Sequence, residues 1–169
     1  MEIWDMVDES RNPLGKLHTR GKEILPGEYH VVVEIFTINA DGRILLTQRD
    51  SLKTYPLKWE STAGSVTAGE NSIDGAIREL KEETGLFVNP EKLRYLGEIK
   101  QENFFLDSYL WISSKNIDIS ELTLQPGEVC DAKFVTLKEL EEMNKTGKIV
   151  PPVWERYQLY FEELFILQD

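Results

Sequence analysis

Apolar and polar positions along the chain alternate in short segments that predict β-strands, with a few segments of helical spacing between them. Residues 29–39 form a long apolar and β-branched run, and the turn Ala40-Asp41-Gly42 leads from it into residues 43–48. This arrangement predicts a hairpin whose two strands are central in the sheet. The same kind of pattern predicts further strands at 3–7, 15–18, 59–64, 93–102, 104–112 and 130–135.

Apolar residues with helical spacing predict helices in three segments: 72–84, 137–143 and 152–167. Asn71 or Ser72 can cap the first of these helices. Gly85 followed by Leu86 is a typical helix stop. The C-terminal segment carries an aromatic stripe, which is far more typical of a packed core than of a ligand site.

Strands and helices in this mixed order predict an α/β/α sandwich with a mixed β-sheet. The chain has 169 residues, of which 41% are hydrophobic and 29% charged. This length can bury one core, whereas two domains would each be rather small. We therefore expect a single domain over residues 1–169, in which residues 1–28 form an N-terminal hairpin extension.

Composition narrows the classes of partner. The formal net charge is −11, from 19 basic and 30 acidic residues, which disfavours long nucleic acid and an anionic membrane surface. No apolar run approaches the ~20 residues of a membrane span, and the polar N-terminus is unlike a signal peptide, so we expect a cytoplasmic location. The single cysteine, Cys130, excludes an intrachain disulfide and a cysteine-rich zinc site. The oligomeric state, including a homodimer, is left open.

The segment 64–86 carries the candidate chemistry. At about 100° per residue, Glu79, Glu82 and Glu83 fall within one arc of the predicted helix, beside a separate apolar arc. Like charges this close repel, so a divalent cation is a natural neutraliser, and hard oxygen ligands favour Mg²⁺ or Mn²⁺ over Zn²⁺. Arg78 lies beside Glu79 and one turn before Glu82, where its guanidinium can hold carboxylates by two parallel hydrogen bonds.

The same segment fits the pattern Gly-x5-Glu-x7-Arg-Glu-U-x-Glu-Glu-x-Gly-U, in which U is apolar. The positions that fit it are Gly64, Glu70, Arg78, Glu79, Leu80, Glu82, Glu83, Gly85 and Leu86. This pattern resembles the box of the Nudix hydrolases. Seven fixed letters coincide by chance at on the order of 10⁻⁸ to 10⁻⁹ per starting position. An acidic surface helix, the alternative, explains neither the flanking glycine nor the Arg-Glu pair.

The resemblance implies hydrolysis of a diphosphate linked to another moiety, by a metal-bound or glutamate-activated water that attacks phosphorus. It implies Glu82 and Glu83 as principal metal ligands and Glu79 as a ligand or general base. Gly64 ends a predicted strand, where its carbonyl could also serve as a ligand. The expected partner is a small-molecule diphosphate. Nucleoside triphosphates, nucleotide sugars, dinucleoside polyphosphates, coenzyme A and nicotinamide dinucleotides all remain open as substrates.

Further candidates lie outside the box. Strand and loop carboxylates often complete the site in this family, and the candidates here are Glu102, Glu121 and Glu128. Substrate phosphates are expected to meet cations, and the candidates are Arg49, Lys58, Lys53 and Arg20. Arg49 is favoured because it ends the second central strand. Any one of these charges alone is more often an ordinary surface residue.

Residues 4–86 also resemble the branch of the superfamily related to isopentenyl-diphosphate isomerase. The segments that carry this similarity are Trp4-Asp5, 15–18, Gly-Glu-Tyr-His at 27–30, 45–49, Tyr55-Pro56 and Trp59. The isomerase has a Cys-Gly-His element on the strand that leads to its box, where this chain has Ala63, Gly64 and Ser65. Because this chain lacks that cysteine and histidine, a diphosphohydrolase is the first hypothesis and an isomerase-like enzyme is the alternative. A catalytically silent nucleotide-binding module is the third hypothesis. His18 and His30 are expected to be packing or surface residues.

Overall fold

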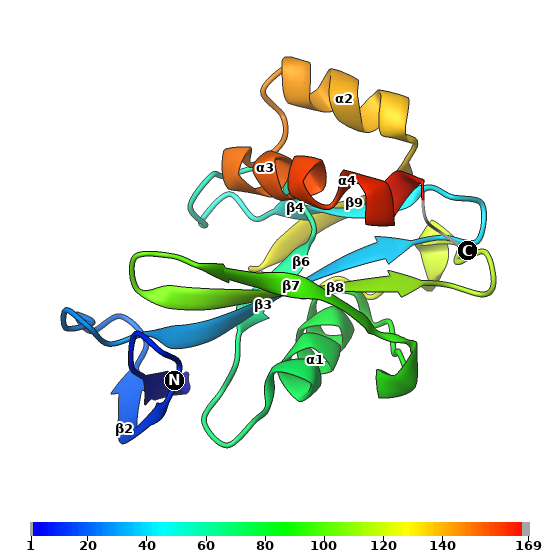
Figure 1. The fold of residues 1–169 in the computed structure, drawn as a ribbon. Helices are drawn as coiled ribbons and strands as arrows, with labels where there is room; N and C mark the ends of the chain where they lie inside the picture. Colours follow the sequence, from blue (N-terminus) through cyan, green and yellow to red (C-terminus); the bar gives the residue numbers. More distant parts are fainter. Residues whose placement is uncertain (1, 167–169) are drawn as a thin grey trace.

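The structure is a computed structural model that describes residues 2–166, and it has a β-sheet with helices on both faces (Figure 1). The strands are β1 (Ile3–Val7), β2 (Pro13–Thr19), β3 (His30–Ile38), β4 (Ile44–Arg49), β5 (Trp59–Glu60), β6 (Thr62–Ser65), β7 (Arg94–Lys100), β8 (Phe104–Ile112) and β9 (Val129–Val135). The helices are α1 (Ser72–Thr84), α2 (Leu137–Lys145), α3 (Pro151–Leu159) and α4 (Phe161–Phe165), with 3-10 turns η1 (Pro90–Lys92) and η2 (Ile119–Glu121). The predicted α/β/α sandwich with a mixed sheet is confirmed.

Strand β3 is the centre of the sheet. It runs parallel to β8 along its whole length, from His30 opposite Phe104 to Ile38 opposite Ile112. Its other edge pairs antiparallel with β6. Strand β4 meets β3 only where Ile38 faces Ile44, and it pairs instead with β5 and β9. The predicted central hairpin is therefore closed only at its turn, because β6 occupies the rest of that edge.

The segment 59–64, predicted as one strand, is two strands separated by Ser61. Strand β5 pairs with β4, and β6 then pairs with β3. The chain thus passes from the edge of β4 to the edge of β3 within a few residues. This crossing leads the backbone directly to the start of the box segment.

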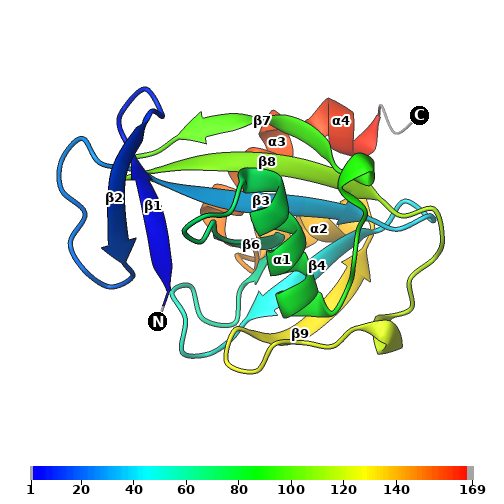
Figure 2. The same cartoon turned by 90° about the horizontal axis from the view of Figure 1, so that it is seen from below.

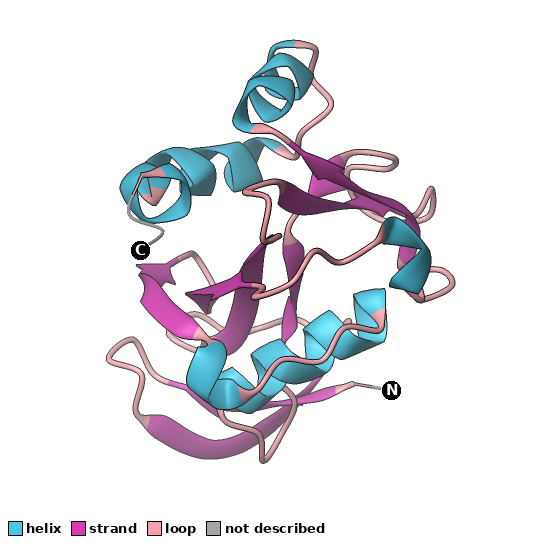
Figure 3. Ribbon diagram, turned by 90° about the vertical axis from the view of Figure 1, so that its right-hand side faces the viewer, coloured by secondary structure: helices cyan, strands magenta, loops and turns pink. Residues whose placement is uncertain are grey.

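Helix α1 covers one face of the sheet and α2, α3 and α4 lie on the other (Figures 2 and 3), and each face has its own core. On one face, Val33 and Ile35 of β3 pack in a cluster with Ala76 and Leu80 of α1. On the other face, the alternate residues of β3 pack beneath α2, α3 and α4. The period-two alternation of β3 therefore serves two buried faces, which explains why most residues of the strand are apolar.

The C-terminal helix was expected over 152–167, but it breaks at Tyr160 into α3 and α4, and residue 167 lies outside the described residues. Arg156 of α3 reaches through to the fully buried Glu34 of β3, with Nε–Oε2 at 2.5 Å and Nη2–Oε1 at 2.9 Å. Ser61 also donates to Glu34. This buried pair fixes α3 to the central strand. Within residues 2–166, no helix is long and apolar enough to cross a membrane.

The N-terminal hairpin of β1 and β2 is a separate two-stranded sheet. Trp4 of β1 stacks with two buried histidines, with ring centroids 5.6 Å from His18 and 3.9 Å from His30. Since His30 belongs to β3, the stack attaches the hairpin to the central sheet. The expectation that the histidines are packing residues is confirmed.

Candidate active site

Helix α1 spans Ser72–Thr84, as predicted. The Asn71 side chain caps it by accepting from the Asp74 amide, and Gly85 ends it with φ of 75°. The apolar arc packs on the sheet as expected, but the carboxylate arc is not simply turned to solvent. Glu82 is exposed, whereas Glu79 and Glu83 are buried at the boundary between helix and sheet.

Gly64 of β6 lies directly against Glu79. A Cβ atom placed on Gly64 would come within 2.0 Å of the Glu79 Cδ atom. A residue with a side chain therefore cannot occupy this position unless Glu79 moves. Glycine is required here by close approach rather than by an unusual backbone conformation.

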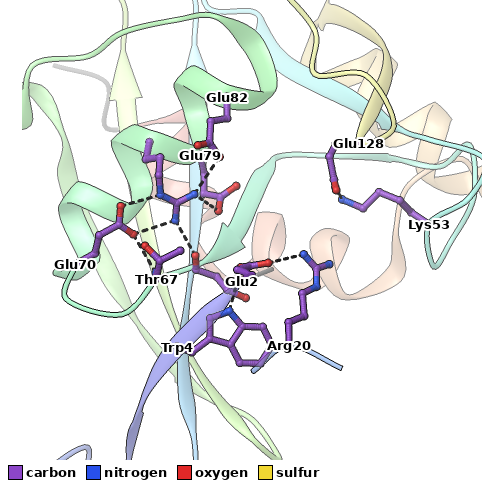
Figure 4. Close-up of polar contacts among 11 residues, drawn as sticks. Glu2, Trp4, Arg20, Lys53, Thr67, Glu70, Glu79, Glu82 and Glu128 are labelled. Atoms are coloured by element: carbon purple, nitrogen blue, oxygen red, sulfur yellow. Dashed lines mark hydrogen bonds and ion pairs between the residues drawn. The ribbon is translucent and has the colours of Figure 1, made fainter. Parts of the chain in front are cut away.

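Arg78 organises the carboxylates of the box (Figure 4). Its Nε and Nη2 atoms bind the two oxygens of Glu70 at 2.7 and 3.0 Å. Its Nη1 atom donates to Glu79 at 2.7 Å and to Glu82 at 3.1 Å, and Nη2 also donates to the Ser65 carbonyl. The two parallel bonds expected for Glu79 or Glu82 thus belong to Glu70, because the loop before the helix folds back onto Arg78.

Glu83 carries the least compensated charge of the site. Its Oε2 atom is buried and has no hydrogen-bond partner. Burial raises the pKa of Glu83 well above its usual value, and the charges of Glu60 and Glu79 raise it further. Burial also raises the pKa of Glu79, although Arg78 opposes this shift. An unpaired buried carboxylate oxygen is costly unless a proton or a cation meets it, so these residues fit a hard divalent ion.

Among residues 2–166, no three carboxylate, histidine or cysteine side chains already converge as a set of metal ligands. In the box, Arg78 accounts for this, since its Nη1 atom engages one oxygen of Glu79 and one of Glu82. The second oxygen of each carboxylate is not held by Arg78. These free oxygens leave Glu79 and Glu82 available to a ligand from the pocket side.

A pocket of about 410 Å³ opens over these residues. Five carboxylates line it: Glu2, Glu79, Glu82, Glu83 and Glu128. Three cations line it: Arg20, Lys53 and Arg78. Five acidic side chains against three basic ones give the pocket an excess of carboxyl groups, which disfavours a diphosphate until a divalent cation is bound.

The cations favoured from the sequence lie elsewhere. Arg49 binds Glu60 through Nη1 at 2.6 Å and the Thr54 carbonyl through Nε at 2.5 Å, and Lys58 donates to the Gly147 carbonyl. Neither lines the pocket, whereas Arg20 and Lys53 do. Arg49 instead supports the loop of residues 50–58, which carries Lys53.

Of the three candidate carboxylates outside the box, only Glu128 lines the pocket. Glu128 lines the pocket and pairs with Lys53. Glu121 closes the cap of η2, and Glu102 is exposed in the turn before β8, so neither lines the pocket. Glu2 does line it, and sequence reasoning missed this residue because no pattern links the N-terminus to the box.

The residues that replace the isomerase element, Ala63 and Ser65, both line the pocket. Cys130 is exposed on β9, with its Sγ atom near the Gln48 and Arg49 carbonyls, and does not line the pocket. The pocket therefore has carboxylates and cations but no thiol.

Comparison with known proteins supplies independent evidence. The family model described as NUDIX domain matches residues 28–154. A relative in Listeria monocytogenes, named an uncharacterized Nudix hydrolase, is 39% identical over 100% of this chain and 96% of its own length. An isopentenyl-diphosphate Delta-isomerase of Streptomyces avermitilis is 30% identical over 83% of this chain and 74% of its own length. The crystal structure of DR0079 from Deinococcus radiodurans has a TM-score of 0.70 at 20% identity, over 88% of this chain and 92% of that chain.

Proposed function

The chain belongs to the Nudix hydrolase family, whose enzymes hydrolyse diphosphate bonds, and on this premise we propose that it is a Mg²⁺-dependent pyrophosphohydrolase. Its substrate would be a diphosphate, such as a nucleoside diphosphate, linked to another moiety. The observation that carries the proposal is the buried, unpartnered Oε2 atom of Glu83 in a pocket with excess carboxylates. Such a pocket is suited to a substrate that arrives with a divalent cation.

Glu82 and Glu83 would hold the ion, together with the carbonyl of Gly64, whose strand runs directly beneath Glu79. Bound there, Mg²⁺ supplies neutralisation of the phosphate charge and activation of water. The donor set consists of hard oxygens, which suits this ion. Arg78 would keep the carboxylates oriented through its contacts with Glu79 and Glu82.

Glu79 is the proposed proton acceptor, a role that the sequence alone left open between base and ligand. One of its oxygens is fixed by Arg78 at 2.7 Å, and its side chain is 12% exposed, so its other oxygen can face a water in the pocket. In the proposed step, a water oxygen bonds to phosphorus, its proton passes to Glu79, and the anhydride P–O bond breaks. The leaving phosphate oxygen keeps the bonding electron pair. Lys53 would neutralise part of the developing charge.

The isomerase alternative is not favoured by the residues of the pocket. An allylic proton shift needs a proton donor and an acceptor on opposite faces of the alkene. Ala63 and Ser65 stand where the isomerase has cysteine and histidine. Glu102, the nearby carboxylate considered for such a role, is outside the pocket lining. The complete box likewise argues against a silent binding module.

The test is a substrate panel containing nucleoside triphosphates, nucleotide sugars, dinucleoside polyphosphates, coenzyme A and nicotinamide dinucleotides. We expect phosphate-containing products in Mg²⁺, none in excess chelator, and a loss on the order of 100-fold in turnover for Glu82→Gln. Glu142→Gln is the matched control, because Glu142 is an exposed carboxylate on α2 that does not line the pocket. Absence of Mg²⁺-dependent turnover across the panel would contradict the proposal.

A further inference from the structure

The N-terminal hairpin brings a cation, Arg20, into the pocket from outside residues 28–154, the part of the chain that the family model matches. We propose that Arg20 is a substrate-binding residue that holds a phosphate oxygen of the diphosphate, which makes the hairpin a working part of the active site. This inference rests on the proposed function, because it names a further group that binds the same substrate.

Arg20 follows β2 and lies among the carboxylates of the pocket (Figure 4). Its Nη1 atom is 2.6 Å from Glu2 Oε2, and its backbone amide donates to the Glu2 carbonyl at 3.0 Å. The hydrogen bond to Glu2 raises the pKa of Arg20, and the charges of Glu128 and Glu79 raise it further. The guanidinium is thus within the electrostatic field of the catalytic carboxylates, while its side chain remains 59% exposed and accessible to a ligand.

The partner of Arg20 is held in place by the aromatic stack. The Trp4 indole donates to Glu2 Oε1 at 3.0 Å, and the Trp4 ring stacks with His18 and His30. Because His30 belongs to β3, the position of Glu2 is set by the central sheet. Arg20 is therefore aimed into the pocket by a supported carboxylate.

The hairpin is also tied to the box itself. The amide of Ala68 donates to the Ile3 carbonyl at 2.8 Å, and the amide of Gly69 donates to Asp5 Oδ2 at 2.7 Å. Ala68 and Gly69 belong to the loop that leads into α1. These contacts fix the position of β1 relative to the loop before α1. Glu2, the partner of Arg20, directly precedes β1 and is therefore fixed as well.

A second tie joins the turn of the hairpin to the first residue of α1. Arg11 binds the buried Asp107 of β8, with Nη1–Oδ1 at 2.7 Å, and the Ser72 hydroxyl donates to the same carboxylate. The hairpin is thus held at one end by the loop before α1 and at its turn by Asp107, which also binds Ser72, so Arg20 has a defined place in the pocket.

Of the three cations that line the pocket, Arg20 and Lys53 are better suited to bind a phosphate than Arg78. Arg78 already binds five acceptor atoms on four residues, Glu70, Glu79, Glu82 and Ser65, and is committed to holding the box together. Among the described residues, the side chains of Arg20 and Lys53 each have one carboxylate partner. An exposed pair such as Arg20–Glu2 contributes little to stability, so a phosphate oxygen can take the place of Glu2 at little cost.

The test compares Arg20→Gln with Lys16→Gln. Lys16 lies on the same hairpin, pairs with Glu28 at 2.6 Å and does not line the pocket, so it controls for loss of a hairpin cation. Binding of α,β-methylene-ADP in Mg²⁺ is measured by calorimetry, and KM and kcat are measured on the substrate that the unaltered protein turns over best. Loss of one charge-assisted hydrogen bond should raise Kd and KM about 10-fold or more in Arg20→Gln. We expect kcat to change less than about 3-fold, Lys16→Gln to match the unaltered protein, and Arg20→Lys to recover part of the loss.

Arg20→Gln with Kd and KM within about twofold of the unaltered protein would overturn the assignment. If the unaltered protein binds the analogue through Arg20 but hydrolyses nothing, the proposed function fails and the Arg20 assignment stands. If it neither binds nor hydrolyses, both fail. If it hydrolyses substrates independently of Arg20, only the inference fails.

Discussion

Arg78 binds Glu70 through two parallel hydrogen bonds, Nε–Oε1 at 2.7 Å and Nη2–Oε2 at 3.0 Å. Glu70 Oε2 also accepts from the Thr67 amide at 3.0 Å, so the loop before α1 is closed onto the helix. The remaining Nη1 atom reaches Glu79 and Glu82. One guanidinium therefore joins the loop to the carboxylates, and a planar fork is required to do both.

Arg78→Lys keeps the charge but should lower kcat/KM by about 10- to 100-fold, because a single ammonium cannot hold Glu70 and orient Glu79 at once. The measurement is steady-state hydrolysis, with Mg²⁺ affinity determined alongside it. An unchanged rate together with unchanged metal affinity would show that Arg78 is an ordinary residue of the helix surface.

Gly64→Ala should cost about 1–3 kcal/mol of unfolding free energy and most of the activity, because the new methyl group would overlap the Glu79 carboxylate. A double-mutant cycle isolates the cause. In a Glu79→Ala background the clash is absent, so Gly64→Ala should cost little there. Equal costs in both backgrounds would mean that another neighbour of Gly64 is responsible.

Glu83→Gln should separate stability from function. In the absence of metal, the buried carboxylate with its unpartnered Oε2 atom is a liability, since burial raises the pKa of Glu83. The folded state then holds its proton more tightly than the unfolded state, so this residue costs stability as pH rises above its unfolded pKa. The neutral amide should therefore be at least as stable at pH 7, while turnover falls on the order of 100-fold or more.

Thermal unfolding with and without Mg²⁺ checks the same substitution. The ion should raise the melting temperature of the unaltered protein and should have a much smaller effect on Glu83→Gln, because the metal stabilises only the state that binds it. Near-normal turnover of Glu83→Gln, or an equal Mg²⁺ shift in both proteins, would remove Glu83 from the proposed site.

Local signals in the sequence were sufficient for the box helix. Asn71 as a cap, the apolar spacing and Gly85 as a stop are all encoded within a few residues, and α1 has the bounds they predict. Contacts between distant segments were not predictable in this way. Helical spacing placed Arg78 beside Glu79, but it could not show that the loop would bring Glu70 onto the same guanidinium.

The same limit applies to the cations. The sequence favours Arg49, at the end of a central strand, as a substrate-binding residue, but its side chain binds Glu60. Burial raises the pKa of Glu60, and the pairing with Arg49 opposes this shift. Arg20 lies at the pocket beside Glu2, which Trp4 contacts while it stacks on His30. Such placements depend on tertiary packing, which periodicity and residue type do not encode.

His30 should make stability depend on pH. Burial, followed by the charge of His18, lowers the pKa of His30 to about 4, so the unfolded state binds its proton more readily than the folded state. Stability from this residue is present above the unfolded pKa of about 6.5 and is lost as pH falls toward 4. The loss between pH 7.5 and 5 should be about 2 kcal/mol.

Denaturant unfolding at several pH values measures this effect, with His30→Phe as the comparison because phenylalanine keeps an aromatic ring against Trp4. The variant should lack the His30 part of the pH dependence, so the stability of the unaltered protein relative to the variant should fall by about 2 kcal/mol between pH 7.5 and 5. Parallel curves over this range would contradict the assigned shift.

The most direct test of the central claim follows the oxygen atom of water during Mg²⁺-dependent hydrolysis in ¹⁸O water. Attack of water on phosphorus predicts one ¹⁸O atom in a phosphate product, with no label on the organic moiety. Isopentenyl diphosphate in deuterated water should gain no deuterium and give no dimethylallyl diphosphate. Label on the organic moiety would contradict attack at phosphorus, and an isomerised, deuterated product formed at a catalytic rate would contradict the hydrolase assignment itself.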